Sequence, residues 1–212
     1  MGKESSISTK EKIFNVSLEL FSKKGYDKVS IREIAKNVGI KESSIYNHYS
    51  KKEDILDTIF EYYKKNMIET KTYYKNVSKI SNKDQRKLYH QGSEAIKNQW
   101  KQPKMKKILR LIFIELYHNE KIRTFFIEEL VNRPIKFWTT IFQIYIDKKI
   151  IKKVNPKKLA KRYHKYALFL IFESMILEYD ENSEESAIEK MFDEVELHFN
   201  FILNSVTLKK YK

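Results

Sequence analysis

The chain has 212 residues, with 42 Lys or Arg against 28 Asp or Glu, so its formal net charge of +14 predicts attraction to a polyanion. It has no cysteine, which excludes disulfides, thiolate zinc sites and cysteine nucleophiles and fits a reducing, cytoplasmic location. No secretory signal is recognisable, and the longest apolar run, residues 166–172, is too short to span a bilayer. Because only four glycines and three prolines can interrupt helices, we expect an all-α protein.

A first helix is predicted before Gly25, since Ile13, Leu20 and Phe21 recur along one stripe. A second is predicted to begin just after Ser30, because Ser30 and Glu33 have the spacing of a capping box, in which each side chain satisfies a free amide at the helix start. Its apolar face consists of Ile31, Ile34, Ala35 and Val38. Gly39 is expected to end this helix, because glycine readily adopts the left-handed conformation that lets the chain turn sharply.

A third short helix is predicted over residues 41–49, with Ile45 and Tyr49 on one face and polar side chains elsewhere. Two short helices joined by a glycine turn form a helix-turn-helix, and short hydroxyls and amides suit a helix lying in the major groove of DNA. The alternative is a helical hairpin without a DNA role, which shares the same capping and periodicity.

Beyond residue 50 the sequence contains few glycines, prolines or other signals that mark the ends of helices. Helices are predicted from residue 51 past 67, over 84–100, 104–118 and 121–147, and from residues 156 and 183 onward. Pro156 suits the first turn of its helix, whereas Pro134 either kinks the long helix or divides it.

The last two helices carry unusually apolar surfaces. The first, residues 159–179, is apolar nearly all round at residues 167–172 and is expected to be buried on more than one side. The second places Val195, Phe199, Ile202 and Val206 along one stripe. Both helices can complete the core of a monomer, but apolarity around the whole circumference favours a partner.

Between the two, residues 148–165 contain nine basic and no acidic side chains. A solvated connector is the favoured interpretation, and a second contact with nucleic acid or an acidic protein is the alternative.

A ligand pocket in the helical core is a further hypothesis, although aromatic residues at helical spacing usually belong to the plain core. His118 and Glu173 are each expected to be buried among apolar residues, where an ionisable group needs a partner, either another side chain or a ligand. The candidate pocket residues are Trp100, Phe113, Tyr117, His118, Phe137, Trp138, Phe169 and Glu173.

The N-terminal quarter resembles the TetR family of transcriptional regulators. The matching segments are LFSKKGYDKVSI, REIAKNVGI, KESSIYNHY and KKEDIL, which follow one another with the right spacing over about residues 9–60. The resemblance implies a three-helix DNA-binding domain over residues 1–52 and a larger helical domain over residues 53–212 for ligand binding and dimerisation. It also implies a homodimer that pairs through the last two helices, binds a palindromic operator in double-stranded DNA and is released by a small-molecule effector.

The resemblance assigns DNA contacts to the third helix and its surroundings. Tyr46 and His48 can donate to phosphate oxygens, whereas Ser44 and Asn47 can read bases. The start of the fourth helix, with its free amides and the charge of Lys52, favours a phosphate. The DNA-binding candidates are Ser30, Lys41, Glu42, Ser43, Ser44, Tyr46, Asn47, His48 and Lys52.

Two residues depart from the family pattern. Lys41 stands where a capping hydroxyl commonly opens the third helix, and a lysine cannot accept an amide hydrogen bond. Glu42 can accept from a cytosine amino group or complement the helix dipole, and the second interpretation is favoured because an acid facing phosphates is costly. The hydroxyl that opens the fourth helix is Ser50.

Other function classes fit poorly. The five histidines lack HExxH spacing, and the sequence contains no glycine-rich phosphate loop and no nucleophile elbow, so we expect no catalysis, metal or cofactor. Two alternatives stay open: a DNA-binding regulator controlled by a partner protein, and a helical enzyme or binding protein that does not bind DNA.

Overall fold

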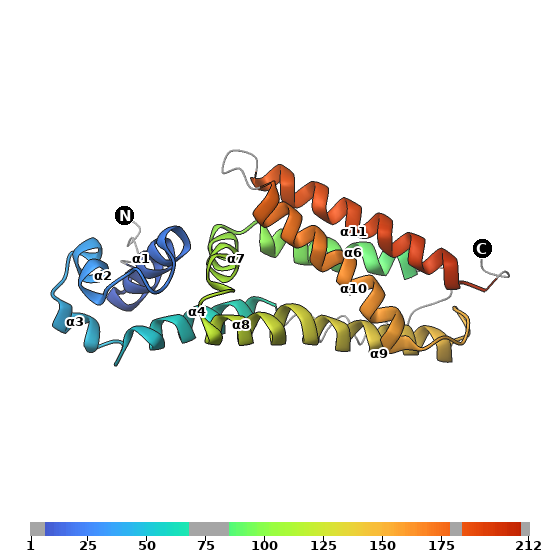
Figure 1. Cartoon of the computed structure of the whole chain (residues 1–212), viewed down its shortest axis with the longest axis horizontal. Coiled ribbons are helices and arrows are strands. Elements are labelled where there is room, and N and C mark those ends of the chain that lie inside the picture. The colour runs from blue at the N-terminus through green and yellow to red at the C-terminus, as the bar shows by residue number, and fades with distance from the viewer. Residues whose placement is uncertain (1–6, 68–84, 179–183, 209–212) are drawn as a thin grey trace, which may run out of the picture. The chain divides into compact units, whose positions relative to one another are not determined.

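In a computed structural model, the described residues, 7–67, 85–178 and 184–208, are almost entirely helical, which confirms the predicted all-α class (Figure 1). The only bridge of β type in these ranges pairs Ile151 with Thr207. The helices are α1 (Thr9–Lys24), α2 (Ile31–Val38), α3 (Glu42–Tyr46), α4 (Lys52–Asn66), α6 (Gln85–Trp100), α7 (Pro103–Glu115), α8 (Glu120–Phe126), the π-helix η1 (Ile127–Asn132), α9 (Arg133–Asp147), α10 (Pro156–Phe172), the π-helix η2 (Glu173–Leu177) and α11 (Glu184–Val206).

Several predicted boundaries shift by a few residues. The third helix is shorter than expected, because residues 47 and 48 form a turn. The helix predicted to end at residue 118 ends at Glu115. Helix α4 ends at Asn66, and its predicted extension past Met67 lies outside the described residues, as do the predicted helix starts at residues 84 and 183.

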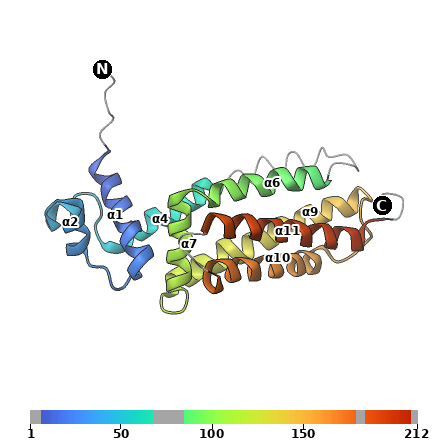
Figure 2. The same ribbon diagram turned by 90° about the horizontal axis from the view of Figure 1, so that it is seen from above.

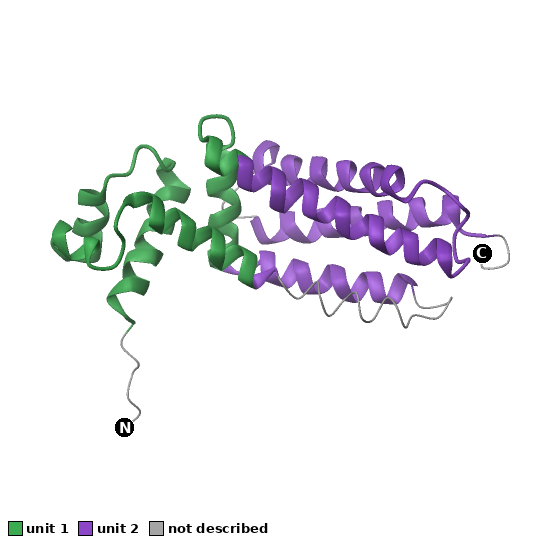
Figure 3. Cartoon of the chain, turned by 90° about the horizontal axis from the view of Figure 1, so that it is seen from below, with its two compact units in different colours: residues 1–65, 103–123 green, residues 66–102, 124–212 purple. Residues whose placement is uncertain are grey.

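The chain folds as two compact units whose boundary differs from the expected division at residue 52 (Figure 3). Unit 1 comprises residues 1–65 and 103–123, and unit 2 comprises residues 66–102 and 124–212. Helix α4 up to Lys65, α7 and the first turn of α8 therefore join the predicted DNA-binding residues in one unit.

Unit 1 is built around α1, which contacts both α2 and α7. Ser8 accepts a hydrogen bond from the Glu11 amide and so caps the start of α1. Apolar side chains from the helices of the unit meet in a shared core. Its fully buried members include Ile13, Leu18, Phe21, Ile34, Ile45, Ile55, Leu56, Ile59, Ile108 and Ile112.

Unit 2 is a bundle in which α10 contacts α9 and α11, and α11 contacts α6 (Figure 2). Its centre is aromatic: the Tyr89 and Phe199 rings stack with centroids 3.7 Å apart, and Trp138 lies 4.7 Å from the Tyr163 ring. The Tyr89 and Tyr163 hydroxyls are 2.8 Å apart and satisfy each other within this core.

The sequence predicts that Pro134 kinks or divides the long helix. In the structure the helix changes to the π-helix η1, which ends two residues before Pro134. An α-helix would use the amide of residue 134 to bond the Leu130 carbonyl, but proline has no N–H. The chain widens into η1 instead, and the buried His164 of α10 donates its Nε2–H to that carbonyl over 2.6 Å. Burial lowers the pKa of His164, so the neutral ring is the favoured form.

The apolar surfaces of the last two helices are arranged differently from the expectation. Val195, Phe199 and Val206 of the predicted stripe are buried in the core of unit 2. By contrast, α10 is not buried all round, because Phe169 is 52% exposed. The outward apolar residues of this pair of helices and η2 are Tyr166, Phe169, Phe172, Ile176, Leu177, Leu197 and Phe201.

The basic segment 148–165 begins directly after α9 and comprises the following turn and the first ten residues of α10, all in unit 2. Its surface residues are Lys149, Lys152, Lys153, Lys157, Lys158, Lys161, Arg162 and Lys165. None of the helices in the described part of the chain has the length and apolarity that a membrane crossing needs.

Candidate nucleic-acid interface

The turn between α2 and α3 has the geometry that the sequence predicts. Ser30 caps α2, because its Oγ accepts from the Glu33 amide over 3.1 Å. The capping box is only half formed, since the Glu33 carboxylate binds Lys24 Nζ instead of the Ser30 amide. Gly39 adopts the left-handed conformation, with φ +79°, and both its amide and that of Ile40 bond the Ala35 carbonyl.

Helix α3 is anchored through one apolar face. Ile45 is fully buried and Tyr49 is 4% exposed, so both are fixed in the core of unit 1. The remaining side chains of this segment face outward, and only Ser44 is half-buried. The exposed candidates are Lys41, Glu42, Ser43, Tyr46, Asn47 and His48.

The start of α3 has no side-chain cap, as Lys41 in that position predicts. Glu42 occupies the first turn, where its charge complements the helix dipole. Its carboxylate also lies 3.8 Å from the Arg32 guanidinium, but both side chains are largely exposed, so this pair contributes little.

Lys52 is placed differently from the prediction that it binds a phosphate. Its ammonium donates to the carbonyl oxygens of Tyr26 and Val29, each over 3.0 Å, and lies 4.1 Å from the centre of the Tyr26 ring. Burial lowers its pKa. The side chain is therefore engaged inside unit 1.

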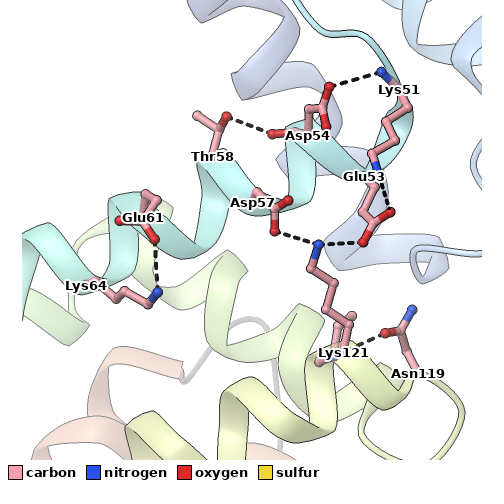
Figure 4. A network of polar contacts seen from close by, with 10 residues as sticks. Lys51, Glu53, Asp54, Asp57, Thr58, Glu61, Lys64, Asn119 and Lys121 are labelled. Atoms are coloured by element: carbon pink, nitrogen blue, oxygen red, sulfur yellow. Dashed lines mark hydrogen bonds and ion pairs between the residues drawn. The ribbon is translucent and has the colours of Figure 1, made fainter.

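The start of α4 is capped by Asp54, whose carboxylate accepts from the Lys51 amide, and not by the Ser50 hydroxyl. Lys51 is exposed and pairs with Glu53 over 3.0 Å. Lys121 of α8 binds both Glu53 and Asp57, over 2.6 and 2.7 Å (Figure 4). Hydrogen bonds from Lys121 and Lys51 lower the pKa of Glu53 to about 2.

Sequence reasoning did not predict that Glu115 and Lys121 belong to unit 1 together with the candidate DNA contacts. Glu115 is buried and accepts from the Tyr26 amide over 2.8 Å, although 89 residues separate the two. A weak signal exists, because Glu115 interrupts the apolar stripe that Ile108 and Ile112 form at helical spacing.

The predicted ligand-pocket residues are divided between the two units. Phe113, Tyr117 and His118 belong to unit 1, and the other five belong to unit 2. Tyr117 is 85% exposed and His118 is also on the surface, which corrects the expectation that His118 is buried.

The pocket candidates in unit 2 have separate surroundings. Trp138 is part of the aromatic core, with Phe137 at its edge, whereas Trp100 packs on Phe192. Glu173 is partly exposed at the start of η2, and Phe169 faces outward.

A hollow of about 430 Å³ in unit 1 includes none of these residues. Its lining side chains are Ser8, Lys10, Glu11, Phe14, Tyr49, Thr58, Glu61, Tyr62, Lys65 and Lys104. Within the described ranges, no three His, Asp or Glu side chains gather as a metal site would.

The N-terminal part of unit 1 matches known proteins in sequence. The family model for bacterial regulatory proteins of the tetR family matches residues 13–59. A stretch of 46 residues is 48% identical to IcaR of Staphylococcus epidermidis, the negative transcriptional regulator of the biofilm operon icaADBC. This match covers 22% of the chain and spans only 25% of that relative's length.

Solved structures match the fold over nearly the whole chain. A protein of Mesorhizobium loti assigned to the TetR-family regulators superimposes with a TM-score of 0.69 at 16% identity and covers 94% of this chain and 97% of its own. A protein of Saccharomonospora viridis described as a transcriptional regulator, in complex with choline, gives a TM-score of 0.59 at 15% identity, with 94% and 98% covered. The helix-turn-helix therefore matches bacterial regulatory proteins of the tetR family in sequence over residues 13–59, and nearly the whole chain matches these solved structures in fold.

Proposed function

We propose that this protein is a repressor of transcription that acts in the cytoplasm and binds double-stranded DNA by laying α3 in the major groove. The observation that carries the proposal is the exposed polar face of α3, held by the buried side chains of Ile45 and Tyr49. A helix fixed in this way presents hydroxyl, amide and imidazole groups to base edges and phosphates without moving. The matching segment of IcaR, a negative regulator, favours repression over activation.

A homodimer is the proposed assembly. Tyr166, Phe169, Phe172 and Ile176 follow one another at three- and four-residue spacing along α10 and η2, and all are exposed. Leu197 and Phe201 are exposed at i, i+4 spacing on α11, which contacts α10. Exposed apolar residues gathered on one pair of helices favour a protein partner, and a second copy supplies the same surface. A twofold dimer would present two α3 helices to half-sites about 34 Å apart on a palindromic operator.

Release by a small molecule is the proposed control. The choline complex of the Saccharomonospora viridis protein supports it, because a chain of this fold accommodates a small ligand there. The effector would lower operator affinity by binding better to the DNA-free state, which requires that DNA lower effector affinity by the same factor. Control by a partner protein instead predicts operator affinity that no small molecule changes.

Selection of bound sequences from a random DNA pool tests the proposal. We expect a palindromic consensus and an affinity that falls steeply with salt, because several phosphate contacts release counterions. The selected DNA, titrated again in the presence of candidate small molecules, separates ligand control from partner control. A protein that binds no DNA even at low salt would rule out the regulator.

A further inference from the structure

Two charged side chains from different helices hold the loop between α1 and α2. Lys52, in the first turn of α4, donates to the carbonyl oxygens of Tyr26 and Val29 over 3.0 Å each. Its ammonium also lies 4.1 Å from the centre of the Tyr26 ring, close enough for a cation–π interaction. Two of the three ammonium protons are thus directed at backbone carbonyls, and the loop is fixed from the side of α4.

Glu115, at the end of α7, holds the same loop by accepting a hydrogen bond from a backbone amide. Its side chain is only 6% exposed, and Oε1 accepts from the Tyr26 amide over 2.8 Å. The carboxylate approaches so closely because residue 25 is glycine: a Cβ there would overlap with Oε1. The backbone amide of Tyr26 therefore donates to the Glu115 carboxylate, and its carbonyl oxygen accepts from the Lys52 ammonium.

These contacts lie directly before the predicted DNA contacts in the chain. Val29, whose carbonyl binds Lys52, is followed by Ser30, which caps α2, and α2 leads through Gly39 into α3. The loop therefore determines where α2 begins.

We propose that Lys52 and Glu115 are positioning residues for DNA binding, which fix the 25–29 loop and through it the start of α2 and the setting of α3. This inference rests on the proposed function. Lys52 then contributes to operator affinity without contacting a phosphate, because two of its ammonium protons bind the carbonyl oxygens and the ammonium lies against the Tyr26 ring.

The dependence of affinity on salt separates positioning from phosphate contact. Each lost phosphate contact lowers the slope of log affinity against log salt by about 0.9, whereas a misplaced helix lowers affinity without a matching change in slope. Lys52→Met removes the ammonium but keeps the length of the side chain. Lys51→Met is the matched control, since Lys51 is the adjacent, exposed lysine and its ammonium binds the Glu53 carboxylate.

We expect Lys52→Met to lower affinity for the selected DNA about tenfold or more at every salt concentration, with the wild-type slope. Amide hydrogen exchange without DNA should become faster over residues 25–30 in Lys52→Met and remain unchanged in Lys51→Met. Lys52→Gln, whose neutral amide keeps two N–H donors on a shorter side chain, provides the intermediate case should the methionine variant unfold.

A slope reduced by about one counterion in Lys52→Met would show a phosphate contact and overturn the proposal. Unchanged exchange in the loop, or equal acceleration in the Lys51 control, would overturn it as well. Failure of the wild-type protein to bind any DNA would refute the proposed function, while the exchange data would still decide whether Lys52 fixes the loop.

Discussion

Two glycines at helix ends in unit 1 differ in what surrounds them. Gly25 has φ +85° and ψ 160°, a region that is essentially restricted to glycine, and a Cβ there would overlap with the Glu115 carboxylate. Gly39 has φ +79° in the left-handed region, but a Cβ there would meet open space. Both positions need a positive φ, and only Gly25 also needs the empty volume.

Gly25→Ala should therefore destabilise unit 1 more than Gly39→Ala. The strained backbone costs about 1–3 kcal/mol, and the displaced Glu115 adds to it. Urea unfolding at neutral pH measures the free energy of unfolding of both variants. In a Glu115→Ala background the difference in destabilisation between Gly25→Ala and Gly39→Ala should shrink. An undiminished difference would contradict the predicted overlap of the new Cβ with the Glu115 carboxylate.

Asn47 lies exposed just after α3, where its amide can bond two groups on a base edge. We expect Asn47→Ala to relax base preference at one or two operator positions, by about 1–3 kcal/mol each, while leaving the salt slope unchanged. Binding to a panel of single-base operator variants measures this effect. A uniform loss over all sequences would instead indicate a contact with the DNA backbone.

Among the elements, the π-helix η1 depends on a residue from another helix. The neutral His164 donates to the Leu130 carbonyl, and burial holds its folded pKa below the unfolded value of about 6.5. A group with a lowered folded pKa contributes stability that is fully present above its unfolded pKa and is lost as pH falls. The free energy of unfolding should therefore decrease between pH 7 and pH 5 in part through His164.

His164→Gln tests this, because a glutamine amide can donate to the same carbonyl but does not titrate in that range. We expect the variant to lose less stability than the wild-type protein over the same pH interval. Denaturant unfolding at several pH values gives both curves. Parallel curves would show that His164 does not contribute to the pH dependence.

The signals that sequence reasoning reads correctly are local. Ser30 caps the helix that follows it, Gly39 ends it, and Pro156 opens α10, because each acts on backbone within four residues. The alternation of Ile45 and Tyr49 with polar neighbours likewise fixes which face of α3 is buried.

Contacts between distant residues were not predictable in the same way. Lys52 and Lys51 are neighbours with the same charge, and only the position of the α1–α2 loop, more than 20 residues earlier, decides which ammonium is enclosed. The effect of Pro134 likewise depends on a distant residue, because His164 of α10 binds the Leu130 carbonyl that Pro134 leaves without an amide partner. The division of the predicted pocket residues between the two units was not predictable either, because aromatic residues at helical spacing carry no information on which of them meet.

For the whole molecule, the proposed dimer places exposed apolar residues of α10 and α11 against their copies. Phe201 is 70% exposed, so Phe201→Glu should leave each chain folded. A carboxylate in an apolar interface lacks a partner, and we expect the dimer to dissociate at least about tenfold more readily. Sedimentation equilibrium measures the change. Thr140→Glu, at an exposed position of α9, is the control and should remain dimeric, whereas an unaltered Phe201 variant would point to a different interface.

The surface lysines of residues 148–165 have a practical consequence for biochemistry on this chain. Nine positive charges with no intervening acid lie in unit 2, against a net charge of +14 for the complete chain. At low ionic strength such a cluster binds any polyanion, including DNA of any sequence. Retention on heparin or a mobility shift with bulk genomic fragments would therefore report largely on residues 148–165. Only competition against excess unrelated duplex measures recognition by α3.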